Sequence, residues 1–132
     1  MPASAPSRIL IVEDNEVFRQ VLSSLLGARF PDLEVLEAVD LAEGAKQFRE
    51  GWPGVVFLDL NLPDGNGLVL AEQIRDERPG TCILVCTSHD LPEYREAAAL
   101  RGATHFLSKG SLDWVELGDL VEAAFRRSAT VC

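Results

Sequence analysis

The chain has 132 residues, of which 47% are apolar and 25% are charged, and its formal net charge at pH 7 is −9. That length suits one domain with an ordinary core, and the apolar fraction excludes a disordered chain. The acidity argues against nucleic-acid binding, which needs a basic face, and no apolar run reaches the roughly 20 residues that span a bilayer.

Five short apolar runs are predicted to be strands. Residues 8–12, 55–58 and 82–86 are apolar at nearly every position, which is typical of parallel strands covered on both faces. Residues 33–38 alternate, as a half-exposed edge strand does, and 105–107 is the shortest candidate. Pro63 and the glycines at 65 and 67 predict a turn after the third strand.

Apolar stripes at helical spacing lie after each strand, within 17–26, 41–48, 68–74, 91–100 and 117–125. Three of these helices are preceded by Asp-x-x-Glu, which predicts an Asp N-cap: Asp40 with Glu43, Asp90 with Glu93, and Asp113 with Glu116. A strand–helix unit repeated five times predicts an α/β fold. We expect a flavodoxin-like, doubly wound five-stranded parallel sheet with strand order 2-1-3-4-5.

The expected organisation is a flexible segment at residues 1–7, one domain at 8–127 and a short tail at 128–132. Residues 1–7 lack an apolar signal-peptide core. Three cysteines, an odd number, agree with a reducing, cytoplasmic location. Cys82 and Cys86 would stand about 13 Å apart on one strand, too far for a disulfide, and are expected to be buried apolar residues.

Polar side chains follow four of the five predicted strands. Glu13 and Asp14 follow the first, Asp59 the third, Thr87 the fourth and Lys109 the fifth. These strands are neighbours in the predicted order, and ligands of such sheets bind at the carboxyl ends of the strands.

Three carboxylates at one edge repel each other, and oxygen ligands beside a phosphoryl group favour Mg²⁺. The central Asp59 can then be the nucleophile that forms an aspartyl phosphate. Lys109 and the hydroxyl of Thr87 would stabilise the phosphoryl oxygens.

Four motifs occur in order along the chain: Ile-Leu-Ile-Val-Glu-Asp-Asn at 9–15, Phe-Leu-Asp-Leu-Asn-Leu-Pro-Asp-Gly-Asn-Gly at 57–67, Thr-Ser at 87–88, and Gly-Ala-Thr-His-Phe-Leu-Ser-Lys at 102–109. Each motif alone is a weak signal. Together they cover about residues 8–126, and in this order the chain resembles the receiver domain of two-component response regulators.

The resemblance implies that Asp59 is the phosphoacceptor. It implies that Asp14, Asp59 and the main-chain carbonyl of Asn61 hold Mg²⁺, while Glu13 acts mainly through water. It also implies a signalling switch, which catalyses only its own phosphorylation and dephosphorylation.

The resemblance implies that Thr87 and Lys109 contact the phosphoryl group. Thr87 and Phe106 would be the switch residues, and Asn61 and His89 would tune the lifetime of the phosphate. Gly110 stands where the family often has proline in a cis peptide. A cis bond before glycine costs about 2.5–4 kcal/mol, so we expect this peptide to be trans or strained.

The implied partners are a histidine kinase or histidine phosphotransfer protein and an unknown output protein, without direct binding of nucleic acid or membrane. The output face would be formed by the fourth helix, the fifth strand and the fifth helix, which also allow a homodimer. The first helix is expected to expose Val17 or Val21 for kinase docking.

Three alternatives stay open from the sequence. The chain could be the receiver fragment of a longer DNA-binding transcriptional regulator. It could be a flavodoxin-like cofactor binder, although the acidic turn at 13–16 would repel phosphate. It could be a phosphatase with an Asp nucleophile, although such enzymes commonly use Asp-x-Asp and Asn61 takes the place of the second acid.

Overall fold

Five parallel strands form the central sheet of the computed structural model, which describes residues 7–130. They are β1 (Arg8–Val12), β2 (Glu34–Ala38), β3 (Val55–Asp59), β6 (Cys82–Thr87) and β7 (His105–Ser108). Their order across the sheet is β2-β1-β3-β6-β7, and every neighbouring pair is parallel. This confirms the predicted order 2-1-3-4-5, because β4 and β5 are a separate hairpin.

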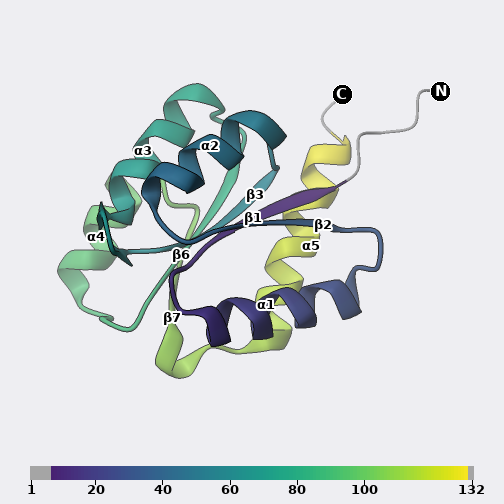
Figure 1. Ribbon diagram of the computed structural model, residues 1–132, viewed down its shortest axis with the longest axis horizontal. Coiled ribbons are helices and arrows are strands. Elements are labelled where there is room, and N and C mark those ends of the chain that lie inside the picture. Colours follow the sequence, from purple (N-terminus) through teal and green to yellow (C-terminus); the bar gives the residue numbers. More distant parts are fainter. Residues whose placement is uncertain (1–6, 131–132) are drawn as a thin grey trace.

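Helices cover both faces of the sheet (Figure 1). Helices α1 (Glu16–Arg29) and α5 (Trp114–Thr130) pack on one face, and α2 (Leu41–Gly51), α3 (Gly67–Glu77) and α4 (Pro92–Leu100) on the other. The double cover explains why all residues of β3 and β6 are buried.

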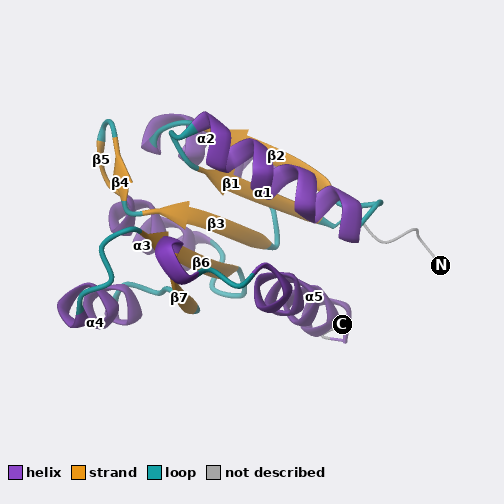
Figure 2. Cartoon of the chain, turned by 90° about the horizontal axis from the view of Figure 1, so that it is seen from below, coloured by secondary structure: helices purple, strands orange, loops and turns teal. Residues whose placement is uncertain are grey.

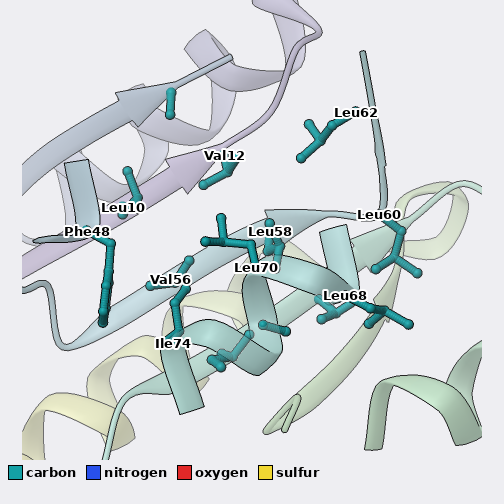
Figure 3. Close-up of a cluster of buried hydrophobic side chains, with 14 of the residues drawn as sticks. Leu10, Val12, Phe48, Val56, Leu58, Leu60, Leu62, Leu68, Leu70 and Ile74 are labelled. Atoms are coloured by element: carbon teal, nitrogen blue, oxygen red, sulfur yellow. The ribbon is translucent and has the colours of Figure 1, made fainter. Parts of the chain in front are cut away.

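The alternation of side chains along each strand divides the core into two clusters. On the α1–α5 face, Ile9, Ile11 and Phe57 pack with apolar residues of the two helices. On the other face the strands and α2, α3 and α4 share a second cluster. Figure 3 labels ten of its residues: Leu10, Val12, Phe48, Val56, Leu58, Leu60, Leu62, Leu68, Leu70 and Ile74.

A short hairpin after β3 was not predicted. Strands β4 (Asn61–Leu62) and β5 (Gly65–Asn66) pair antiparallel, and Figure 2 shows the hairpin projecting beyond the end of β3. At its turn Asp64 accepts hydrogen bonds from the N–H groups of Leu41 (2.8 Å) and Ala42 (3.1 Å). These bonds lower the pKa of Asp64 and tie the hairpin to the start of α2.

Two of the three predicted N-caps are confirmed. Asp40 accepts from the N–H of Glu43 at 2.8 Å and caps α2. Asp113 Oδ1 accepts from the N–H groups of Val115 (2.9 Å) and Glu116 (3.1 Å) at the start of α5. In both places a side-chain oxygen satisfies amides that the first helical turn leaves unpaired.

The predicted cap at Asp90 is wrong. The N-cap of α4 is Leu91, which makes no side-chain cap bond, and the helix opens with Pro92. The carboxylate of Asp90 instead accepts two hydrogen bonds from the guanidinium of Arg95, at 2.6 and 2.7 Å. A bidentate ionic pair outcompetes a single amide for this carboxylate.

The ends of the fold differ in detail from the sequence prediction. Helix α5 runs to Thr130, past the expected end of the domain at 127. Residues 1–6 of the predicted N-terminal segment and residues 131–132 lie outside the described residues. The peptide between Lys109 and Gly110 is trans, because no peptide bond within residues 7–130 is cis. Cys82 and Cys86 are buried free thiols, as predicted.

No helix within residues 7–130 combines the length and the apolar character that crossing a bilayer demands.

Candidate functional site

The predicted site residues meet at the carboxyl edge of the sheet. Asp59 and Thr87 are the last residues of β3 and β6, and Glu13 and Lys109 directly follow β1 and β7. The strands are in register, since Val12 pairs with Leu58 and Thr87 with Ser108. Because Asp59 pairs with Cys86, Thr87 lies one residue and Lys109 two residues beyond the level of Asp59, and the four strand ends present their polar side chains at the same edge of the sheet.

Three carboxylates form a cluster at this edge. One oxygen from each of Glu13, Asp14 and Asp59 lies within 4.8 Å of the other two. Glu13 is completely buried, Asp59 is buried and Asp14 is exposed. Such a cluster disfavours joint ionisation unless a cation lies beside it.

Lys109 supplies one positive charge to the cluster. Its Nζ lies 2.6 Å from Glu13 Oε1 and 3.4 Å from Asp59 Oδ2. Burial raises the pKa of Glu13 to about 7, against the lowering effects of Lys109 and of the Asn15 N–H. Burial tends to lower the pKa of Lys109, but the contacts with Glu13 and Asp59 outweigh it and the net change is upward.

The donor set fits a hard divalent cation. One ammonium, paired with Glu13 Oε1 at 2.6 Å and lying 3.4 Å from Asp59 Oδ2, cannot balance three carboxylates. Oxygen ligands of this kind suit Mg²⁺.

Arg19 fixes the acidic turn after β1, although sequence reasoning did not single it out. Its guanidinium donates to the carbonyl oxygen of Glu13 (2.8 Å) and to Glu37 Oε1 (2.8 Å). Asn15 Oδ1 accepts from the N–H of Phe18 at 2.9 Å and caps α1. An arginine on a helical face carries no signal of such a role in the sequence.

Asn61, His89 and Thr87 are linked by hydrogen bonds next to Asp59. The side-chain Nδ2 of Asn61 lies 3.1 Å from Nδ1 of His89, so the two predicted tuning residues are in direct contact. The N–H of Asn61 donates to Asp59 Oδ1 at 3.2 Å. Thr87 is buried, and its Oγ1 accepts from the N–H of His89 at 3.1 Å.

Gly67 is predicted only as a turn residue, but it is also needed because the backbone of Asp59 lies against it. A Cβ at Gly67 would lie 2.2 Å from the carbonyl oxygen of Asp59, so a side chain there would push on the backbone of the acidic residue. Gly65, by contrast, has a φ of 146° and is needed for the turn itself.

Phe106 lies on β7 and is partly buried against the core cluster of the α2–α3–α4 face. The guanidinium carbon of Arg95 lies 4.8 Å from the centre of its ring. The predicted switch residue Phe106 is therefore in contact with α4.

Comparison with known proteins gives the family. The model of the response regulator receiver domain matches residues 9–122, most of the chain. The chain belongs to the response regulator receiver domain family. Phosphorylation and Mg²⁺ binding are typical of this family, whose members act in two-component signalling.

Curated relatives of this receiver domain include multidomain regulators. It is 37% identical over 103 residues to the DNA-binding transcriptional activator DevR/DosR of Mycobacterium tuberculosis, covering 77% of this chain and 47% of the relative. It is 41% identical over 81 residues to a protein-glutamate methylesterase/protein-glutamine glutaminase of Chromobacterium violaceum, covering 61% and 22%. The chain thus spans about half or less of the length of these relatives.

Solved receiver structures share the fold. A LuxR-family response regulator from Aurantimonas sp. SI85-9A1 has a TM-score of 0.80 at 32% identity, covering 90% of this chain and 84% of that one. A receiver domain from Clostridium thermocellum has a TM-score of 0.86 at 24% identity, covering 96% and 99%.

Proposed function

We propose that this receiver domain accepts a phosphoryl group on Asp59 in a Mg²⁺-dependent reaction and signals through protein binding. The donor is a histidine kinase or a histidine phosphotransfer protein. The observation that carries the proposal is the place of Asp59: a buried carboxylate beside Lys109, within 4.8 Å of two further carboxylates.

The transfer exchanges one bond to phosphorus for another. An Asp59 carboxylate oxygen attacks the phosphorus of the phosphohistidine, the P–N bond breaks, and the imidazole leaves with its electron pair and takes up a proton. Lys109, already 3.4 Å from Asp59 Oδ2, is placed to neutralise charge on the phosphoryl oxygens. The hydroxyl of Thr87 would donate a hydrogen bond to another of these oxygens.

Asp14, Asp59 and the main-chain carbonyl of Asn61 would hold Mg²⁺, with Glu13 acting mainly through water. Bound there, the ion would supply positive charge that lets a phosphoryl group approach an acidic cluster. The excess of three clustered carboxylates over the single ammonium of Lys109 supports this part of the proposal.

The signal would pass from Thr87 to Phe106. Thr87 Oγ1 accepts a hydrogen bond from the N–H of His89, and a movement of Thr87 toward a phosphoryl oxygen would alter this contact. Phe106 would follow and change the face formed by α4, β7 and α5. The contact between Asn61 and His89, next to Asp59, would tune how long the phosphate persists.

Two surfaces would bind partners. On α1, Val17 is 72% exposed and Val21 is 43% exposed, and Val115 at the start of α5 is also exposed, so this face suits kinase docking. The α4–β7–α5 face would bind the output protein or a second copy. A solved relative with 30% identity is a beryllofluoride-activated NtrC4 receiver domain dimer, which supports the second possibility.

A second candidate is the same switch at the head of a longer DNA-binding regulator. The similarity to DevR/DosR, of which this chain covers 47%, favours it. In either case catalysis by this domain would be limited to its own phosphorylation and dephosphorylation. The buried free thiols of Cys82 and Cys86 support a cytoplasmic location.

Phosphorylation of Asp59 is tested with acetyl phosphate and Mg²⁺. Intact-mass measurement should show one added phosphoryl group in the wild type and none in Asp59→Asn or after removal of Mg²⁺. Asp76→Asn, an exposed Asp on α3 outside the cluster, is the matched control and should label like the wild type. Labelling of Asp59→Asn would refute the assignment.

The metal role of Asp14 is tested by titration calorimetry with Mg²⁺. Asp14→Ala should abolish measurable binding, because it removes one of the carboxylates that would hold the ion. Asp32→Ala, an exposed Asp in the loop before β2, should bind like the wild type. Wild-type affinity in Asp14→Ala would contradict the metal role.

A further inference from the structure

Lys109 touches an aromatic ring as well as two carboxylates. Its Nζ lies 4.7 Å from the ring centre of Phe18, on α1, in addition to the contacts with Glu13 (2.6 Å) and Asp59 (3.4 Å). Within residues 7–130, the hydrogen bonds and ion pairs of this ammonium go to these two carboxylates only. An ammonium has three N–H donors, so two carboxylates and one ring face account for all of them.

The ring of Phe18 is itself held by three elements. Phe18 lies in the first turn of α1, where its N–H donates to the cap residue Asn15. Its ring centre is 6.1 Å from that of Phe57 on β3 and 5.9 Å from that of Trp114 on α5. Figure 1 shows the start of α1 beside the segment that joins β7 to α5. The ring therefore has little freedom to move away from Lys109.

The aromatic character of Phe18 is the informative feature. The apolar stripe of α1 requires only an apolar residue at position 18, and leucine occupies positions 22 and 26 of the same stripe. Lysine carries its charge on a flexible four-carbon stem, which needs external contacts to hold one geometry. The Lys109 side chain is only 19% exposed, and a cation–π contact gains strength as water is excluded.

We propose that Phe18 is a positioning residue, whose ring face holds the Lys109 ammonium beside Glu13 and Asp59 in readiness for the phosphoryl group. The role in phosphoryl transfer rests on the function proposed above, whereas the contact between ring and ammonium does not. The two parts are therefore tested separately.

The contact is tested by NMR of the resting protein. A methylene group held over a ring face is shifted upfield, so the Lys109 protons next to Nζ should resonate upfield of those of Lys46, the other lysine of the chain and an exposed residue. Phe18→Tyr should keep this shift and Phe18→Leu should abolish it. An unshifted Lys109 in the wild type, or an unchanged shift in Phe18→Leu, overturns the proposal.

The consequence is tested by the initial rate of labelling by acetyl phosphate with saturating Mg²⁺. Phe18→Leu should be about three- to tenfold slower than the wild type, and Phe18→Tyr should restore the rate. Phe125→Leu makes the same substitution in the same core cluster, away from the site, and should label normally. A normal rate in Phe18→Leu, or an equal loss in Phe125→Leu, overturns the positioning role. Absence of wild-type labelling overturns the function instead, and leaves the NMR result to decide the contact.

Discussion

The segment from β7 to Lys109 makes a cation–ring contact on each face of the sheet, and the two contacts differ in character. Toward α1 the segment supplies the cation, because Lys109 lies over the ring of Phe18. Toward α4 it supplies the ring, because Arg95 lies over Phe106. The distances are nearly equal, at 4.7 and 4.8 Å.

The two cations have different carboxylate partners. Lys109 pairs with Glu13, whose side chain is fully buried, whereas Arg95 and its partner Asp90 are 50% and 35% exposed. Exposed pairs contribute little to stability, and a buried carboxylate is costly to leave alone. The α1 side of the site is therefore fixed, and the α4 side is held by contacts that can be exchanged at small cost. This division suits the proposed switch, whose output would lie on the α4 side.

Of the two cations, Lys109 is expected to give the larger effect when it is replaced. Replacing Lys109 by Met leaves the buried Glu13 carboxylate without its cation. The carboxylate can then lose its charge only by taking up a proton. The pKa of Glu13 is about 7 with Lys109 beside it, and loss of the ammonium would raise that pKa further. At pH 8 without Mg²⁺ the folded state must then either hold an unpaired buried charge or bind a proton, and we expect a loss of about 2 kcal/mol in the free energy of unfolding. Urea denaturation measures this loss.

Two variants calibrate that measurement. Lys46→Met makes the same change at an exposed position of α2, and Arg95→Met removes the cation on the α4 side. Each should cost less than about 1 kcal/mol. A loss of unfolding free energy in Lys109→Met no larger than in these two variants would contradict the difference between the two sides.

A smaller effect is expected at Phe106 in Arg95→Met. Loss of the guanidinium should free the ring, so that its NMR signals move toward the values of a mobile phenylalanine, while overall stability changes little. Arg101→Met is the control, because Arg101 lies at the end of the same helix, α4, but pairs with Glu72. Unmoved Phe106 signals in Arg95→Met would mean that packing alone holds the ring.

The smallest effect is expected from acid. The bidentate bond to Arg95 lowers the pKa of Asp90, so the contribution of this pair is fully present above the ordinary Asp pKa of about 3.9. It is lost as the pH falls through the lowered pKa. The Phe106 signals should therefore shift in the same acid range in which Asp90 titrates by NMR, and should lose that step in Asp90→Asn.

The layout of the fold could be predicted from the sequence because runs such as 82–86 are apolar on both faces, which only a doubly covered strand requires. The site followed from the same layout, since the polar residues that end neighbouring strands must meet. The absence of the expected cap at Asp90 could not be predicted, because it depends on a competing arginine five residues later.

The hairpin after β3 and the role of Phe18 were missed for related reasons. A two-residue strand is too short to show a period, so β4 and β5 leave no pattern. Phe18 was assigned to an apolar stripe, and its contact with Lys109, far along the chain, exists only after folding.

The position of Asp59 within the sheet has a consequence for how the domain opens. Asp59 ends the central strand β3, between β1 and β6, where its neighbour Leu58 pairs on both sides. Backbone amides in such a strand exchange with solvent only through the largest openings of a protein, whereas an edge turn such as Lys109–Ser111 opens by fraying. We therefore expect the amide of Asp59, the proposed phosphoacceptor, to exchange more slowly than the amides of the turn at 109–111, although the side chain of Lys109 is held by its ion pairs. Opening of that turn would leave Asp59 in place.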